Sequence, residues 1–429
     1  MNMILFNKIL KLYKEQVLNM KLKSLENRNT AMDIIRIVAV FFVICIHFFL
    51  NSGFYGQVVS GTNMYILFIL RTLSSVCIPM FLILTGYLMC KKILSKKYYV
   101  GNVKTLIIYI LASIFCTLFK VYYLNTPIDF GDFILSVLNF SGAPYSWYIE
   151  LYIGLFLLIP FLNVMYNKLE SKRKKQVLVL TLIVITVLPS IINIFSVTSD
   201  SLCFNPTLGD AITKLVPAWW KEFYPVTYYI TGCYLREYGL KIKTSVLTIL
   251  FVVCTFVFSS FNYYRSYGEL FEAGQYIAWN GFEPYLLGVM FFVLLSRINA
   301  NKFPKVIRRV IYKISSVSLG IYLISYIPDT IIYAQLNIKV ALISDKLIYF
   351  LPVTLIVLLC SIFLAFILNV AVNIILGICK ELKGIVLIVK GESQIDIMST
   401  ISESEVNDIN TKIKKEHSHK DIIKSKNQV

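Results

Sequence analysis

Two side chains that could bind and transfer chemical groups lie in one apolar segment near the start of the chain. The segment from Asp33 to Leu50 contains Arg36 and His47, and it is long and apolar enough to cross a bilayer as a helix. Arg36 and His47 are eleven residues apart. At about 100° per residue they point the same way, about 16 Å apart along the helix axis. Ionisable side chains are costly inside a bilayer, so this arrangement predicts a functional site.

His47 is the main candidate for proton transfer. It is the only histidine before residue 417, and imidazole is the side chain that gains and loses a proton near neutral pH. The alternative is a structural histidine that is hydrogen-bonded to a neighbouring helix. Asp33 precedes Arg36 by three residues, close enough on a helix to pair with the guanidinium and hold it in place. This pair favours the functional interpretation, with Asp33 and His47 as the catalytic candidates.

The composition is that of a membrane protein. Hydrophobic residues make up 57% of the chain, charged residues 15%, and the mean hydropathy is +0.70. The nine cysteines are scattered, with no Cys or Cys/His cluster, so we expect neither a disulfide framework nor a metal site. The net charge of +18 comes from short basic clusters between apolar runs, which indicates membrane topology rather than nucleic-acid binding.

Apolar runs of span length predict an all-α polytopic integral membrane protein in the cell membrane. The lysines and arginines lie in alternate connections, and the positive-inside rule then places both termini in the cytoplasm. About ten spans are expected, at 34–52, 64–90, 103–124, 146–166, 176–196, 223–236, 245–262, 276–296, 314–335 and 347–379.

Three regions follow from this pattern. Residues 1–30 are basic and amphipathic, and they predict a cytoplasmic helix at the membrane interface rather than a cleaved signal peptide. Residues 31–380 form the multi-span membrane domain. Residues 381–429 become polar, and we expect them to be a disordered cytoplasmic tail.

Further polar residues in the predicted spans are weaker candidates. Arg71, Glu150 and Glu283 are expected in the outer halves of their spans. Arg71 could form a buried pair with Glu150 or with Glu283, or these groups could orient an acceptor or His47. Trp147 could belong to an aromatic belt at the lipid headgroups or form a stacking platform for a sugar. Lys104 could be a topological anchor or a phosphate ligand.

Four motifs, in order, carry a resemblance to a known family. They are Asp-x-x-Arg-x10-His at residues 33–47, Ile-Pro-Met-Phe-Leu-Ile-Leu-Thr-Gly-Tyr-Leu at 78–88, Trp-Tyr-Ile followed by Tyr-Ile-Gly-Leu at 147–155, and Ser-Leu-Gly-Ile-Tyr-Leu-Ile at 318–324. Together they resemble the acyltransferase-3 family, membrane-bound acyltransferases that modify cell-surface carbohydrates. The resemblance covers most of residues 30–380.

The resemblance implies an acyl-CoA donor on the cytoplasmic side, which we expect to be acetyl-CoA, and a hydroxyl of a cell-surface or envelope glycan as acceptor. Arg36, helped by Lys104, would hold the phosphates of coenzyme A, and His47 would act as general base. The separation of about 16 Å between them is of the order of the pantetheine arm. No permanently bound cofactor and no metal are implied, and polysaccharide-synthesis proteins are the expected partners.

Two features depart from the family pattern. The stretch 96–104, which is often rich in arginine in the family, contains lysines and no arginine here. The histidine that often closes the fourth motif is Ser325. The resemblance also leaves an alternative function open: a permease for a small solute, or an exporter of a surface polysaccharide, in which Arg36 and His47 line a transport path.

Overall fold

The computed structural model describes residues 29–192 and 217–389. Nearly all of the predicted interfacial segment 1–30, and residues 390–429 of the predicted tail, lie outside the described residues. Residues 381–389, predicted to belong to a disordered tail, are helical instead, because the helix that begins at Phe350 continues to Val389. The chain divides after Asn369 into two units. The site described below lies in the first unit, where the described residues form helices and the one β pairing is an isolated bridge between Val59 and Tyr267.

Eight helical segments among the described residues are long and apolar enough to cross a membrane, so the chain is an all-α polytopic membrane protein. They are Thr30–Gly56, Gly61–Met89, Lys96–Tyr122, Trp147–Lys168, Lys172–Ile191, Thr244–Arg265, Gln275–Ser296 and Ile343–Ile378. The other two predicted spans, 223–236 and 314–335, coincide with shorter helices. The count of ten and the placement of both termini in the cytoplasm stay predictions.

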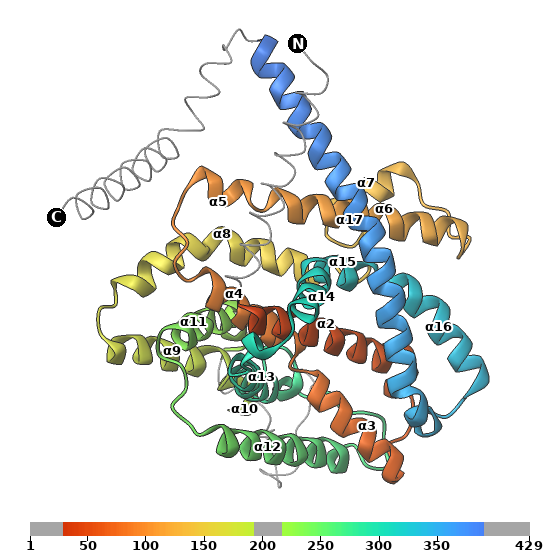
Figure 1. Cartoon of the computed structure of the whole chain (residues 1–429). Helices are drawn as coiled ribbons and strands as arrows, with labels where there is room; N and C mark the ends of the chain where they lie inside the picture. Colours follow the sequence, from red (N-terminus) through yellow and green to blue (C-terminus); the bar gives the residue numbers. More distant parts are fainter. Residues whose placement is uncertain (1–28, 193–216, 390–429) are drawn as a thin grey trace, which may run out of the picture. The chain divides into compact units, whose positions relative to one another are not determined.

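The α-helices among the described residues are labelled in Figure 1, and some of the predicted spans are divided between two or more of them. The main ones are α2 (Thr30–Asn51), α3 (Gly61–Ser74), α4 (Cys77–Met89), α5 (Lys96–Val100), α6 (Val103–Tyr122), α7 (Phe130–Leu138), α8 (Trp147–Lys168), α9 (Lys172–Thr186), α10 (Pro189–Ile192), α11 (Tyr224–Tyr238), α12 (Thr244–Arg265), α13 (Phe282–Ser296), α14 (Lys305–Ser316), α15 (Ser318–Ile324), α16 (Tyr326–Lys339) and α17 (Phe350–Val389). Short 3₁₀ helices connect some of them: η1 (Phe54–Gly56), η2 (Ala218–Phe223), η3 (Gln275–Ile277), η4 (Ala300–Lys302) and η5 (Ile343–Tyr349).

Helix α2 is the central element of the bundle. The side chain of Asn29 caps its first turn by accepting a hydrogen bond from the Ala31 amide at 3.1 Å. The helix packs against α3, α4, α13, α14, α15 and α16. In its most apolar stretch 67% of the residues are buried, against 22% in the corresponding stretch of α12. Helix α2 is therefore largely surrounded by other helices of the protein, whereas α12 has a wide apolar face that can contact lipid.

Helices α4 and α11 approach so closely that each needs a glycine at the contact. A Cβ atom added to Gly86 would lie 1.9 Å from the carbonyl oxygen of Tyr229, and one added to Gly232 would lie 2.1 Å from that of Ile83. Small residues at such crossings let two helix backbones meet in a membrane, where van der Waals packing holds helices together. Helix α4 also packs against α2, so the close contact with α11 helps to hold α4 in its place beside α2.

Two of the predicted spans that pack around α2 are divided into shorter helices. Helix α3 ends at Ser74 and α4 begins at Cys77, so the predicted span 64–90 is two helices. Pro79 has no amide hydrogen for the preceding turn, which weakens the helix at this point. The predicted span 314–335 is likewise divided at Val317 and at Ser325. The second division brings the start of α16 to the C-terminal end of α2, where His47 lies.

Candidate active site

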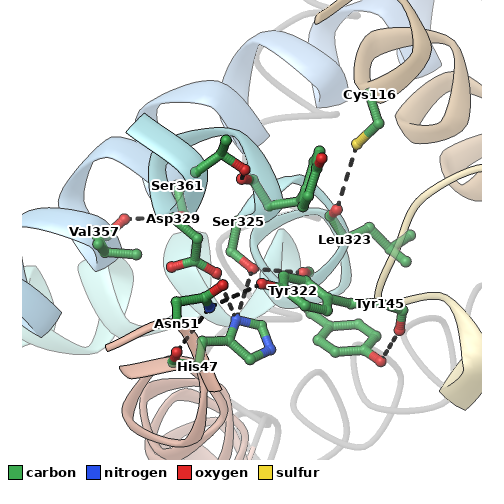
Figure 2. Close-up of polar contacts among 12 residues, drawn as sticks. His47, Asn51, Cys116, Tyr145, Tyr322, Leu323, Ser325, Asp329, Val357 and Ser361 are labelled. Atoms are coloured by element: carbon green, nitrogen blue, oxygen red, sulfur yellow. Dashed lines mark hydrogen bonds and ion pairs between the residues drawn. The ribbon is translucent and has the colours of Figure 1, made fainter. Parts of the chain in front are cut away.

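The imidazole of His47 is held by two side chains from the start of α16. Its Nδ1 atom lies 2.8 Å from Oδ2 of Asp329 and 3.3 Å from Oγ of Ser325 (Figure 2). The side chains of His47 and Asp329 are 5% and 0% exposed, so solvent barely screens this contact. A carboxylate beside Nδ1 favours the tautomer in which Nδ1 carries the proton, which leaves the lone pair on Nε2.

Tyr145 covers one face of the imidazole. Its ring stacks on that of His47 with a centroid separation of 3.8 Å and an interplanar angle of 29°. Asn51, one turn after His47, donates through Nδ2 to the carbonyl oxygen of His47 at 2.8 Å and to the Tyr145 hydroxyl at 3.3 Å. Burial, together with the nearby Asp329 carboxylate, raises the pKa of Tyr145, so its phenol stays protonated. These contacts fix the plane of the imidazole.

His47 lines a cavity of about 440 Å³, which we call the His47 cavity. No hydrogen-bond partner contacts Nε2 among the described residues, so this nitrogen is available to a molecule in the cavity. The lining includes polar, cationic and aromatic side chains: Tyr55, Arg71, Ser75, Tyr145, Trp147, Lys221, Gln275, Trp279 and Tyr322. The volume is within the range of sites for small ligands.

Arg36 lines a second, smaller cavity of about 220 Å³, which we call the Arg36 cavity. Its guanidinium Nη1 donates to Oγ of Ser315 at 3.0 Å and lies 3.4 Å from Oδ1 of Asp33. The Ser315 hydroxyl also donates to Asp33 at 2.7 Å. The rest of the lining is largely apolar, and its polar members are Thr85, Thr105, Tyr148, Tyr152, Ser318 and Tyr322.

The two cavities share a wall. Val43, Ile78 and Tyr322 line both of them. Helix α2 is unbroken from Thr30 to Asn51, so the prediction that Arg36 and His47 share one face of one helix is confirmed. Val43 lies on the same face, seven residues after Arg36 and four before His47. A molecule extended along this face would meet the guanidinium at one end and the imidazole at the other.

Asp33 lies at the Arg36 end of α2. It precedes His47 by fourteen residues on an unbroken helix, a rise of about 21 Å, which is too far for contact. The predicted pairing of Asp33 with Arg36 is confirmed, and the carboxylate that contacts His47 is that of Asp329.

The remaining candidates are dispersed. Arg71 and Trp147 line the His47 cavity. Glu150 is exposed and lines a third cavity of about 520 Å³, which Trp147 also borders. Glu283 is buried and accepts a hydrogen bond from Nδ2 of Asn262 at 2.9 Å. Lys104 is exposed at the start of α6 and lines neither the Arg36 cavity nor the His47 cavity.

Arg71 does not form the pair with Glu150 or Glu283 that the sequence suggested. Among the ion pairs of the described residues it has none; its Nε donates to the Tyr55 hydroxyl at 3.0 Å, and its guanidinium lies over the ring of Phe271. Helix α3, which carries Arg71, packs against α12, η5 and α2, whereas Glu150 lies on α8. An interaction with aromatic rings replaces the expected carboxylate.

Asp329 and Tyr145 were not among the residues predicted for the site. Asp329 is an acid inside a predicted span, and the reasoning applied to Glu150 and Glu283 applies to it equally. It also follows Ser325 by one helical turn, which places it on the same side as the position where the family often has a histidine. Tyr145 gave no such signal, because it precedes the Trp-Tyr-Ile motif in a segment without periodicity.

Metal ligands do not gather in this region. Within residues 29–192 and 217–389 no three His, Cys, Asp or Glu side chains form a group that could hold a metal ion. The charged side chains that line the two cavities are Arg36, Arg71 and Lys221, and the His47–Asp329 pair lies at the wall of the larger one.

The comparison with protein families agrees with this geometry. A family model described as an acyltransferase domain, that of the acyltransferase-3 family, matches residues 29–370. The chain belongs to the acyltransferase-3 family. The matched residues include α2, the lining of both cavities, and His47 and Asp329. Membership of this family makes the chain a membrane acyltransferase. Comparison with curated proteins and with solved structures gives no match.

Proposed function

We propose that this acyltransferase-3 protein moves an acetyl group from acetyl-CoA to a hydroxyl of a cell-surface or envelope glycan in the cell membrane, with His47 as general base. The observation that carries the proposal is the buried His47–Asp329 contact of 2.8 Å beside a cavity that shares a wall with the Arg36 cavity. His47, a base with a fixed tautomer, lies at one end of a continuous face of α2, and the cation Arg36 lies at the other end.

The donor enters from the Arg36 end, which the positive-inside rule assigns to the cytoplasm. The guanidinium binds the phosphates of coenzyme A, and Asp33 and Ser315 orient it as positioning residues. The Arg36 cavity holds about 220 Å³ and is largely apolar, which suits the pantetheine arm better than the nucleotide. The nucleotide stays outside, near exposed Lys104 and its neighbour Thr105, which lines the cavity.

The acceptor enters the His47 cavity from the opposite side. Nε2 of His47 takes the proton of the acceptor hydroxyl as the oxygen attacks the thioester carbonyl. The new C–O bond forms, the C–S bond breaks, and the imidazolium returns its proton to the coenzyme A thiolate. Asp329 stabilises the imidazolium and keeps the tautomer that has its lone pair on Nε2. Polysaccharide-synthesis proteins would supply the acceptor.

The experiment compares the wild-type protein with His47→Gln in purified form. Radiolabelled acetyl-CoA and the surface glycan of the producing cells are supplied, and both label transfer and free thiol are measured. We expect a loss of about 10²- to 10⁴-fold in turnover, because a general base is removed. Lys120→Gln is the matched control, since it removes a charged group from a span but lines neither cavity.

Turnover in His47→Gln equal to that in Lys120→Gln would refute the role of the base. A wild-type protein that neither binds nor cleaves acetyl-CoA would refute the enzyme itself. That second result, joined with glycan that accumulates inside a deletion strain, would favour the exporter or permease that the sequence left open.

A further inference from the structure

The His47 cavity has an excess of positive charge. Arg71 and Lys221 line it, and no aspartate or glutamate is among its lining residues in the described part of the chain. Asp329 is not among the lining residues; it lies behind the imidazole, with its Oδ2 atom 2.8 Å from Nδ1 of His47. Glu283 is buried and accepts a hydrogen bond from Asn262; it interacts with Arg71 through its charge but forms no ion pair with it. A ligand in this cavity therefore meets two cations, Arg71 and Lys221, that form no ion pair among the described residues.

Arg71 is held in a fixed orientation with two nitrogens unused. Its Nε donates to the Tyr55 hydroxyl at 3.0 Å, and its Cζ lies 4.4 Å from the centroid of the Phe271 ring and 5.6 Å from that of Tyr55. Nη1 and Nη2 have no hydrogen-bond partner among the described residues. A guanidinium with a planar, pre-oriented fork binds carboxylate or phosphate oxygens in pairs.

The position of Arg71 at the end of α3 has a structural effect as well. A cation in the last turn of a helix is stabilised by the helix dipole. That interaction is satisfied by charge alone, and a lysine would serve it equally. The helix dipole does not explain why the guanidinium is held against the rings of Tyr55 and Phe271 at the wall of a cavity. It also does not explain why Nη1 and Nη2 remain available to a ligand.

Aromatic walls face the same cavity. The rings of Trp147 and Trp279 stack with a centroid separation of 6.3 Å and an interplanar angle of 18°, and both line the cavity with Tyr145. Indole rings present flat apolar faces with a polar edge, which suits the faces of a sugar ring. The cavity thus combines a surface for a sugar with two cations for an anionic group.

We propose that the acceptor is an anionic sugar, whose carboxylate or phosphate group binds Arg71 and Lys221 while a hydroxyl of the same glycan reaches Nε2 of His47. This inference rests on the proposed function, because it names the class of acceptor for the same site. Neutral sugars could reach the aromatic walls, but they would leave the donors of Arg71 unpaired, which lowers their affinity.

The experiment measures the acceptor KM of the wild type and of Arg71→Gln on three glycan preparations. The first is native, the second has its carboxyl groups reduced to alcohols, and the third has its phosphate esters removed with hydrofluoric acid. On native glycan we expect Arg71→Gln to raise the acceptor KM about 10- to 100-fold, the loss expected for a charge-assisted pair. The KM for acetyl-CoA should not change.

The ratio of the two KM values identifies the anion. On the preparation that lacks the recognised group, the ratio should fall to about one: carboxyl reduction identifies a carboxylate, and hydrofluoric acid identifies a phosphate. Arg71→Lys should lie between the wild type and Arg71→Gln, and Lys221→Gln should show the same dependence on preparation with a smaller ratio. Arg236→Gln, which removes an exposed guanidinium that lines neither cavity, controls for net charge.

An Arg71→Gln ratio that is the same on all three preparations would overturn the anionic acceptor, even where transfer by the wild type is normal. A wild type that transfers acetyl to none of the preparations and does not cleave acetyl-CoA would instead overturn the proposed function. The two failures are therefore distinguishable in one set of assays.

Discussion

The two ends of α2 carry the two ionisable groups of the site, but the protein holds them differently. At one end the side chain of His47 is 5% exposed and contacts Asp329, Ser325 and Tyr145. At the other end the side chain of Arg36 is 25% exposed and borders a cavity half as large. Proton transfer depends on distances within a few tenths of an ångström, whereas a phosphate can be bound by a cation that adjusts to it. The difference in burial matches these two tasks.

The largest effect should come from the partner of the imidazole. Asp329→Asn keeps the size of the side chain but removes the charge that fixes the tautomer and stabilises the imidazolium. We expect kcat to fall about 10²- to 10⁴-fold with the KM for acetyl-CoA nearly unchanged, measured as label transfer in purified protein.

Asp33→Asn is the matched control, because it neutralises the buried acid of α2 itself, at the Arg36 end of the helix. It should change the KM for acetyl-CoA and leave kcat within a few-fold. If both substitutions affected the same kinetic constant, the assignment of one task to each end of α2 would be wrong.

Much of α2 was predictable from the sequence. The length of the apolar run predicts a span over 34–52, and the structure has the helix at Thr30–Asn51. The shared face of Arg36 and His47 follows from the helical period alone and is confirmed. Local physical rules suffice here because neither proline nor glycine interrupts the segment.

The partners of α2 were less predictable. Asp329 is 282 residues from His47 in sequence, and its contact depends on the division between α15 and α16 at Ser325. A proline at residue 328 indicates a weakened helix but does not fix where the chain turns. The same limit applies to Arg71, whose aromatic partners Tyr55 and Phe271 depend on how α3 packs and not on a sequence spacing.

The second effect concerns the donor. Arg36→Gln should raise the KM for acetyl-CoA about 10- to 100-fold, since it removes a charge-assisted contact with phosphate, and kcat should stay within a few-fold. The measurement is repeated with S-acetylpantetheine, a donor without phosphates. On that donor the wild type and Arg36→Gln should have the same KM, which isolates the phosphate contact. A loss of equal size on both donors would show that Arg36 supports the structure of the cavity and does not bind phosphate.

The smallest effect should come from a buried cation beyond the His47 cavity. Nζ of Lys346 donates to the carbonyl oxygen of Ser52 and to Oδ1 of Asn337, both at 2.7 Å, and Nδ2 of Asn337 donates to the carbonyl oxygen of Asn51 at 2.8 Å. These bonds join η5 and the end of α16 to the end of α2. Through Asn51 they extend to the hydroxyl of Tyr145, the ring that covers His47.

Lys346→Met keeps most of the side-chain volume and removes these donors. We expect kcat to fall about 3- to 10-fold, because the imidazole loses part of the support for its plane, while both KM values change little. Lys339→Met is the matched control, since Lys339 is exposed on α16 and outside this chain of hydrogen bonds. Equal kcat values for the two variants would show that the contacts at the end of α2 stabilise the fold without aligning His47. A lower kcat for Lys346→Met alone would show that the connection between α16 and α17 helps to hold the imidazole of His47 in place.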